Sequence, residues 1–363
     1  MTWIGLREPN EPAIFRPDGL APSQPAPFRP QPVWNPDSIL SRGTLMAEFF
    51  VEPSKTRQNL LRYSARHPWL SSLTICIDPD NRLHLLTGQA DRSVSASLPI
   101  TLNVFRQPIV LTYAWDGPAR RAVFSAYFPD SGALHFAEIA DPLPLSLRDA
   151  ERIITHQAQS QTAVRLRFLT ISDQMEPIGP PATLGKDTIV TTMAGPKTIQ
   201  TLRPGDLVQT ADGDVAQVRW IGQQELPARG SFAPHIVRAP YYGLTRDILT
   251  SPEQRLRLDG SRIEYLFGEE AVFAKVRDLA DAVSILKPRN FNTMHYYQVL
   301  LDRHAIINAS GGFLDSLDAS YLYDDPAVHR YSILRELPVE LMPDRNTLEL
   351  PVLRNFEATT LVN

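Results

Sequence analysis

The segment from Thr198 to Gly222 reads TIQTLRPGDLVQTADGDVAQVRWIG, and it decides how the second half of the chain is interpreted. Pro204-Gly205 predicts a turn, and the run 207–210 that follows has the character of a short strand. Asp212-Gly213 is typical of a tight hairpin turn, and apolar alternation resumes over 216–221. The segment therefore predicts two antiparallel strands joined by a hairpin.

The chain has 363 residues, a length that predicts two or three domains because one hydrophobic core rarely extends so far. Its hydrophobic share of 43%, charged share of 21% and net charge of −4 are ordinary for a soluble globular protein. No basic run indicates a nucleic-acid partner, and no apolar run is long enough for a membrane span. The first residues, MTWIGLREPNEP, lack the features of a classical signal peptide, which leaves the cytoplasm and export by another route both open.

Cys76 is the only cysteine, so the sequence excludes an intrachain disulfide and a thiolate-rich zinc site. We expect no metal and no cofactor. Cys76 lies in the strand-like run 73–77, where a small buried core residue is favoured over a reactive thiol.

Residues 1–36 contain nine prolines, including Pro22, Pro25, Pro27, Pro30 and Pro32. Proline has no amide donor and a fixed φ, so we expect residues 1–40 to form an extended arm without helix or central strand. A passive tether is favoured over a segment that docks into an aromatic-lined groove.

From about residue 41 to 175 short apolar runs alternate with turn sequences, which is typical of an antiparallel β-sandwich. The expected strands lie at 44–51, 73–77, 82–86, 94–98, 109–113 and 122–128. Their order and the turns Asp78-Pro79-Asp80-Asn81 and Trp115-Asp116-Gly117-Pro118 resemble a concanavalin-like, laminin-G type jelly roll. The resemblance implies sugar binding, for which Trp69, Trp115 and Asp116 are the candidates; packing and turn formation are the competing interpretations.

Residues 176–182 contain three of the prolines and predict a linker. Beyond it, the Leu-Arg-Pro-Gly-Asp hairpin is followed by RDILTSPEQRL at 246–256, VLLDRHAII at 299–307 and LPVLRNFEA at 350–358. This series resembles the bacterial Hint domains, the self-processing fold shared by hedgehog C-terminal domains and inteins. The resemblance implies a Hint domain at 183–318 with a C-terminal extension at 319–363, and with the sandwich it predicts an all-β protein.

Hint chemistry needs a nucleophile at the first residue of the domain and a histidine that protonates the departing amide nitrogen. The resemblance places the nucleophile, normally a cysteine, at Thr183. The Ser-Pro-x-His pattern of the family matches Ser251-Pro252-Glu253-Gln254, so the histidine position holds Gln254. The terminal His-Asn pair of inteins matches Ala309-Ser310. His304 is either a surviving proton relay or, as we favour, a structural residue, and Glu253 or His235 would replace the missing acid only if close to Thr183.

These substitutions predict a non-enzymatic protein with degenerate autoprocessing positions, which acts as a binding or assembly module for a glycan or another protein. The alternative is a self-processing protein that uses the Thr183 hydroxyl for an N-to-O acyl shift and is cut before that residue. Whether Tyr321, Tyr323 and Pro338 in the extension pack on the Hint domain or on a neighbour is left open.

Overall fold

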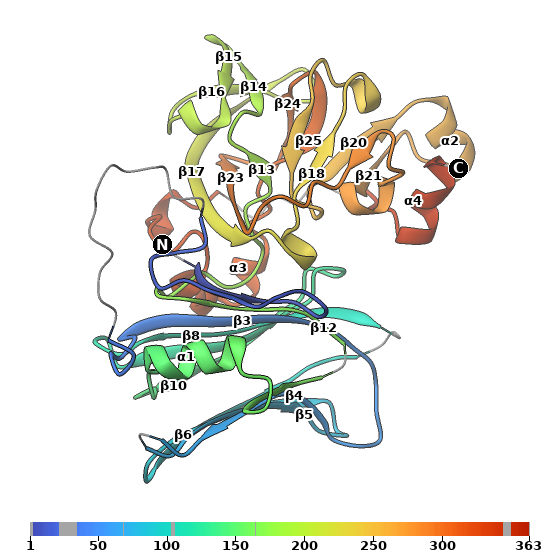
Figure 1. Cartoon of the computed structure of the whole chain (residues 1–363). Helices are drawn as coiled ribbons and strands as arrows, with labels where there is room; N and C mark the ends of the chain where they lie inside the picture. Colours follow the sequence, from blue (N-terminus) through green and yellow to red (C-terminus); the bar gives the residue numbers. More distant parts are fainter. Residues whose placement is uncertain are drawn as a thin grey trace. The chain divides into compact units, whose positions relative to one another are not determined.

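The structure is a computed structural model that describes residues 3–21, 35–67, 69–102, 106–163, 165–343 and 350–362. The chain divides into two compact units, residues 1–180 and 181–363 (Figure 1). Each unit has a hydrophobic core of its own. The fold is all-β, built from antiparallel sheets, as the sequence predicted. Pro22, Pro25, Pro27, Pro30 and Pro32 of the predicted arm lie outside the described residues.

Unit 1 is a β-sandwich of two antiparallel sheets. The first runs in the order β10-β9-β8-β3-β12-β1-β2, with strands β1 Trp3–Arg7, β2 Ile14–Phe15, β3 Arg42–Val51, β8 Gln107–Asp116, β9 Arg121–Tyr127, β10 Leu134–Ala140 and β12 Leu166–Ser172. The second runs β11-β4-β5-β6-β7, with strands β4 Gln58–Ala65, β5 Ser71–Ile77, β6 Arg82–Gln89, β7 Arg92–Pro99 and β11 Ser160–Thr162. All six strands expected from the sequence are present.

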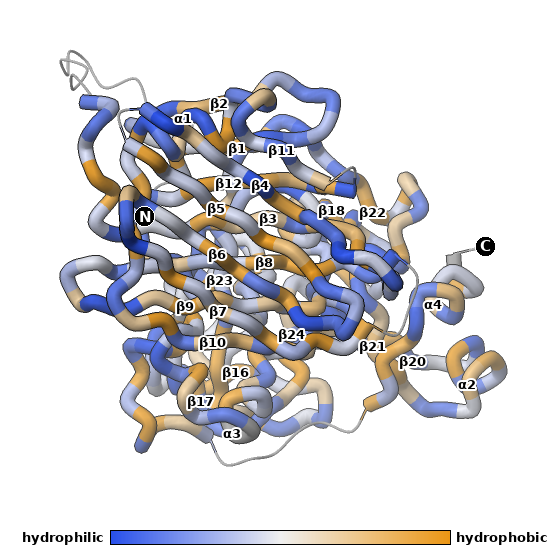
Figure 2. The backbone as a smooth tube through the Cα atoms, turned by 90° about the horizontal axis from the view of Figure 1, so that it is seen from below, coloured by the Kyte–Doolittle hydropathy of each residue, from blue (hydrophilic) through white to orange (hydrophobic). Residues whose placement is uncertain are grey.

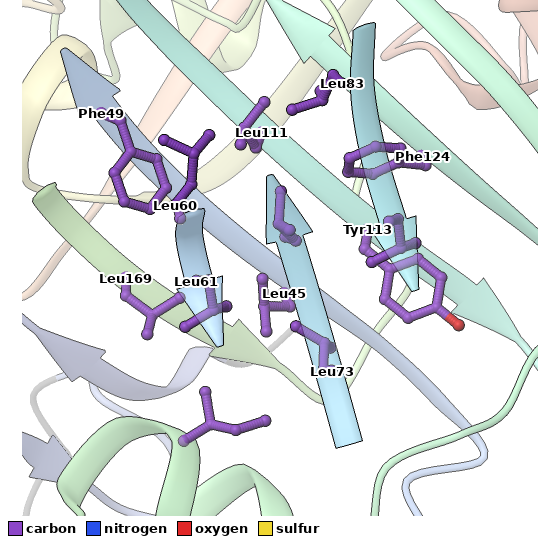
Figure 3. Close-up of a cluster of buried hydrophobic side chains, with 14 of the residues drawn as sticks. Leu45, Phe49, Leu60, Leu61, Leu73, Leu83, Leu111, Tyr113, Phe124 and Leu169 are labelled. Carbon is purple, nitrogen blue, oxygen red and sulfur yellow. The ribbon is translucent and has the colours of Figure 1, made fainter. Parts of the chain in front are cut away.

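The core of unit 1 lies between the two sheets and is filled by alternate residues of each strand. Leu45 and Phe49 of β3 and Leu111 of β8 meet Leu73 and Leu83 of the opposite sheet (Figure 3). Most of these side chains are fully shielded from solvent. The alternation of apolar residues along each strand therefore places their side chains in one layer between the two sheets.

The prediction that the first 40 residues contain no central strand was wrong for β1. Trp3–Arg7 pairs with β12 on one side and with β2 on the other, and all five residues are buried. The stretch precedes Pro9, so each of its residues keeps the amide that a sheet requires, and Trp3, Ile4 and Leu6 supply apolar surface.

Helix α1, Leu147–Thr155, packs its apolar face on the first sheet. The Ser146 hydroxyl caps the helix by accepting a hydrogen bond from the Asp149 amide at 3.0 Å. Gly5 of β1 allows the close approach, because a Cβ there would lie 2.7 Å from Ile154. This helix was not predicted from the sequence.

Unit 2 is organised around one long sheet in the order β21-β20-β25-β24-β14-β16-β17-β23-β13-β19-β18-β22, with β15 paired to β14. Its strands are β13 Leu184–Gly185, β14 Ile189–Thr192, β15 Gly195–Thr198, β16 Leu207–Gln209, β17 Val215–Pro227, β18 His235–Val237, β19 Ile248–Thr250, β20 Arg255–Asp259, β21 Ala271–Lys275, β22 Ile285–Leu286, β23 Thr293–Leu301, β24 Ile306–Ala309 and β25 Gly312–Asp315. Its α-helices are α2 Ser261–Phe267, α3 Tyr321–Asp324 and α4 Asn355–Val362.

The hairpin predicted around Asp212-Gly213 is confirmed. β16 pairs with the start of β17, with Val208 opposite Ala216. Gly213 has φ of +84°, a conformation that glycine adopts without strain. β17 then continues into a long pairing with β23, which carries the chain to the middle of the sheet.

The described end of the C-terminal extension belongs to the core of unit 2. Val352 forms a bridge to Phe273 of β21, and Leu353 and Ala358 are buried in the hydrophobic core. The Asn355 side chain donates a hydrogen bond to Asp278 at 2.8 Å, which fixes the start of α4. Residues 350–362 are therefore an integral part of this unit.

Candidate functional site

Thr183 lies at the entrance to β13 and is held by the two strands beside it. Its amide donates to the Tyr297 carbonyl of β23 at 3.3 Å, and its carbonyl accepts from the Ser251 amide at 2.7 Å. Gly185 lets β13 approach β19 closely, since a Cβ there would lie 2.7 Å from the Leu249 carbonyl oxygen. Thr183 is 6% exposed, so its backbone and side chain are both fixed inside the unit.

The Thr183 hydroxyl donates a hydrogen bond to Oε1 of Gln254. Nε2 of Gln254 donates to two backbone carbonyls, that of Arg255 at 2.9 Å and that of Asp315 at 3.1 Å. Those two acceptors fix the orientation of the amide, because only its nitrogen carries protons. The oxygen must therefore face Thr183, and the hydroxyl proton has a neutral acceptor rather than a base.

Ser251 acts on this site through its backbone and through the turn that it begins. Its hydroxyl accepts from the Glu253 amide at 3.2 Å, and its carbonyl accepts from the Gln254 amide at 3.3 Å. These bonds form the turn that carries Gln254 from β19 toward Thr183. The sequence grouped Thr183, Ser251 and Gln254, and the structure brings these three together.

The peptide bond between Ala182 and Thr183 is buried and hydrogen-bonded. The N–H of this bond is that of Thr183, which donates to the Tyr297 carbonyl at 3.3 Å, and Ala182 is fully buried. The N–H of the preceding bond, that of Ala182, donates to Oε1 of Gln224 at 3.3 Å. An acyl shift at this bond requires a hydroxyl that loses its proton and a group that protonates the Thr183 nitrogen. The amide of Gln254 supplies neither function near neutral pH.

His304 is buried and bound to Asp315, with Nε2 of the ring 2.7 Å from Oδ1 of the carboxylate. Burial lowers the pKa of His304, but the hydrogen bond and charge of Asp315 outweigh it and the pKa is raised overall. Arg255 lies 3.3 Å from the other carboxylate oxygen. His304 is thus connected to Gln254 through Asp315, a residue that the sequence analysis missed.

Glu253 and His235 have other environments. The Glu253 carboxylate binds the Lys275 ammonium at 3.1 Å and the Arg277 guanidinium at 2.6 Å. His235 is 4% exposed, Nδ1 lies 3.0 Å from the Ala233 carbonyl oxygen, and burial lowers the pKa of the ring to about 4. His235 faces Thr250 across the β18–β19 ladder. No contact places either residue on the Thr183 hydroxyl within the part of the chain that the structure describes.

Two of the three sugar-binding candidates in unit 1 are buried and have structural partners, as in the competing interpretation. Trp115 is fully buried, its indole N–H donates to the Leu40 carbonyl at 2.8 Å, and it packs over Gly43. Asp116 forms an ion pair with Arg42 at 3.2 Å and accepts from the Ala119 amide at 3.2 Å, which is turn chemistry. Trp69 is half-buried and stays a candidate.

The described residues contain no group of three or more His, Cys, Asp or Glu side chains placed to hold a metal ion. None of the helices in the described ranges combines the length and the apolar character of a membrane span. Cys76 is buried, as expected.

Comparison with protein families matches residues 182–319 to the model described as Hint domain. This segment is a Hint domain. The match begins one residue before Thr183. The protein therefore combines a β-sandwich with a Hint domain.

Among solved structures, the chain is similar to the gp41-1 intein, with 14% identity, a TM-score of 0.26 and coverage of 37% of this chain and 98% of that one. It is also similar to the Ruminococcus gnavus IT-sialidase CBM40 bound to alpha2,3 sialyllactose, with 12% identity, a TM-score of 0.27 and coverage of 37% and 76%. A third likeness is to tailspike protein 2 from Escherichia coli O157:H7 bacteriophage CAB120, with 14% identity, a TM-score of 0.26 and coverage of 36% and 20%. Comparison with curated proteins found no match.

Proposed function

We propose that this protein is a non-catalytic binding or assembly protein, in which the Hint domain is retained as a scaffold and the chain stays whole. The observation that carries the proposal is the hydrogen bond from the Thr183 hydroxyl to Oε1 of Gln254. It joins a weak nucleophile to a group that neither accepts nor delivers a proton near neutral pH.

Two substitutions slow cleavage at this site. General acid catalysis is typically worth about 10² to 10⁴ in rate, and a glutamine at the histidine position removes that contribution. An alcohol has a much higher pKa than a thiol, so the serine-like hydroxyl of Thr183 needs a base that the thiol of a relative does not. Both losses act on the same bond, between Ala182 and Thr183, and both slow its cleavage.

The alternative is slow self-processing with Thr183 as nucleophile. One observation favours it: both flanking strands still position Thr183, and the residue remains buried beside the Gln254 position. Intact mass separates the two functions. We expect one species near 40.7 kDa after prolonged incubation at neutral pH, with and without added thiol. A wild-type chain that splits between Ala182 and Thr183, and a Thr183→Ala chain that does not, would overturn the proposal.

A restoration experiment tests the cause. The double variant Thr183→Cys, Gln254→His puts a thiol and an imidazole at the two positions that the structure holds together. We expect it to be cut at this junction on addition of thiol, Thr183→Cys alone to be cut more slowly, and Gln254→His alone to stay whole. If the double variant also stays whole while its thermal unfolding matches that of wild type, the loss of activity lies in other residues as well.

The binding role falls to the β-sandwich in this proposal, with a glycan or another protein as partner. Trp69 is the remaining aromatic candidate for stacking on a sugar. A glycan array probed with wild-type protein and with Trp69→Ala tests that candidate; equal binding by the two would remove Trp69 from the site.

A further inference from the structure

A groove of about 470 Å³ lies on the outer face of the second sheet of unit 1, over β6 and β7. These strands lie side by side in Figure 2, next to β5. The groove contains neither Trp69 nor either of the other two residues considered above. It is lined by Arg57, Asp78, His84, Leu85, Leu86, Ser95, Ala96 and Ser97.

The hollow arises from a difference in side-chain size between paired strands. His84 and Leu86 project outward from β6, whereas β7 presents serines at the paired positions, with Ser97 opposite His84 and Ser95 opposite Leu86. Alternate residues of both strands face the core, so the outward row is free of core packing. Short hydroxyl side chains beside taller ones leave a polar depression in the sheet.

The two charged groups of the groove, Asp78 and Arg57, differ in how many hydrogen bonds they form within the protein. Oδ1 of Asp78 accepts from the Asp80 amide at 3.1 Å and the Arg82 amide at 2.8 Å, and Oδ2 lies 2.9 Å from Nε2 of His84. The hydrogen bond from His84 and that from the Arg82 amide keep the pKa of Asp78 low. Arg57, by contrast, is exposed and has no hydrogen bond or ion pair with any described residue. Arg57 is therefore the charged group of the groove that is still open to a ligand, whereas the Asp78 carboxylate already has three partners.

The remaining polar atoms suit a ligand with hydroxyl groups. The Ser97 oxygen accepts from Arg82 at 3.1 Å, which leaves the proton of that hydroxyl to donate outward. Ser95 is exposed, and Nδ1 of His84 is left open because Nε2 faces Asp78. Leu86, 48% exposed, adds an apolar side wall. The groove thus offers hydroxyl and imidazole groups together with an arginine.

We propose that this groove binds an acidic saccharide, with the carboxylate of the sugar on Arg57 and sugar hydroxyls on Ser95, Ser97 and His84. A guanidinium pairs with a carboxylate through two parallel hydrogen bonds, which fixes the orientation of the ligand as well as its charge. The inference rests on the proposed binding function and names the ligand class for it. It concerns residues of unit 1 alone, so it is independent of whether the chain is cut before Thr183.

The test is a titration of the full-length protein by calorimetry with sialyllactose and with a galacturonate trisaccharide, using lactose as the neutral probe. We expect at least one acidic saccharide to bind and lactose to bind at least tenfold more weakly. Arg57→Gln should weaken the acidic ligand about tenfold or more, since a hydrogen bond to a charged group is worth about one to two factors of ten. Ser95→Arg, which fills the groove, should abolish binding.

Arg62→Gln is the matched control, because Arg62 is exposed on β4 of the same sheet but does not line the groove. It should leave the affinity within twofold of wild type. Thermal unfolding and intact mass of each sample confirm that the variants are folded and report separately on the fate of the Ala182–Thr183 bond. The inference is overturned if neither acidic saccharide binds, if lactose binds equally well, if inorganic phosphate competes as effectively as the sugar, or if Arg62→Gln weakens binding as much as Arg57→Gln.

Discussion

The carboxylate of Asp315 binds His304 at 2.7 Å, while the backbone carbonyl of the same residue accepts a hydrogen bond from Gln254 at 3.1 Å. Asp315 therefore connects the Thr183–Gln254 pair to the one buried imidazole that carries a carboxylate partner among the described residues of unit 2. The arrangement keeps His304 occupied with Asp315 and holds the Gln254 amide in one orientation.

Removal of the Thr183 hydroxyl tests the hydrogen bond on which the functional proposal depends. Thr183→Val keeps the shape of the side chain but leaves Oε1 of Gln254 buried without its donor. We expect the free energy of unfolding to fall by about 1 to 3 kcal/mol, measured by urea denaturation. Thr191→Val on β14, a half-buried position, is the control and should change it by less than about 0.5 kcal/mol. Equal stability of Thr183→Val and wild type would contradict the bond.

The His304–Asp315 pair predicts a loss of stability on the alkaline side. The pKa of His304 is raised in the folded state, so its contribution is fully present below the unfolded pKa of about 6.5 and is lost as pH rises through the folded value. Urea unfolding between pH 6 and pH 9 should show this decline. In His304→Gln the free energy of unfolding should fall less over the same pH range. An unchanged pH profile in this variant would show that other groups cause the decline.

His235 predicts the opposite dependence at lower pH. Its pKa falls from the ordinary value of 6.5 to about 4 because burial disfavours the charged ring. The contribution of the neutral His235 ring to the free energy of unfolding is fully present above pH 6.5 and is lost as pH falls toward 4. The total loss is roughly 3 kcal/mol. An NMR titration of the ring should find it neutral at pH 5.5. Protonation of His235 with a midpoint near 6.5 would refute the buried environment.

We expect the replacement of Glu253 by glutamine, a side chain of nearly the same size, to lower the stability of the protein strongly. Glu253→Gln removes the charge that faces Lys275 and Arg277, and Lys275 is itself nearly inaccessible to solvent. We expect a loss of about 3 to 5 kcal/mol in the free energy of unfolding, because breaking a buried ion pair leaves an uncompensated charge. The exposed Glu264→Gln on α2 is the control, with an expected change below about 0.5 kcal/mol. A change of similar size in both variants would show that solvent screens the pair.

Local patterns in the sequence predicted much of this structure. The Asp212-Gly213 hairpin and the six sandwich strands follow from turn residues and alternation, and the family motifs placed Thr183 and Gln254 in one site. β1 was missed because nearby prolines dominated the composition of residues 1–36. Trp115 was considered as a sugar-binding residue because its position at a strand end did not show that its ring packs on Gly43 and binds the Leu40 carbonyl.

Asp315 was missed for a different reason. Its bond to Gln254 uses a backbone carbonyl, a group that every residue has, and the two residues are far apart in the sequence. The groove over β6 and β7 was also missed, because serines on a strand look like an ordinary solvated face until the pairing with His84 and Leu86 is known.

The pairing of β1 with β12 has a consequence for how the protein is made. During synthesis Trp3–Arg7 is made before the other strands of the sandwich, whereas its partner β12 is the last long strand of the sandwich to be made. Until then Trp3, Ile4 and Leu6 have no sheet to join and are open to chaperones that recognise apolar segments. Completion of the first sheet must therefore wait until β12, close to the end of unit 1, has been synthesised.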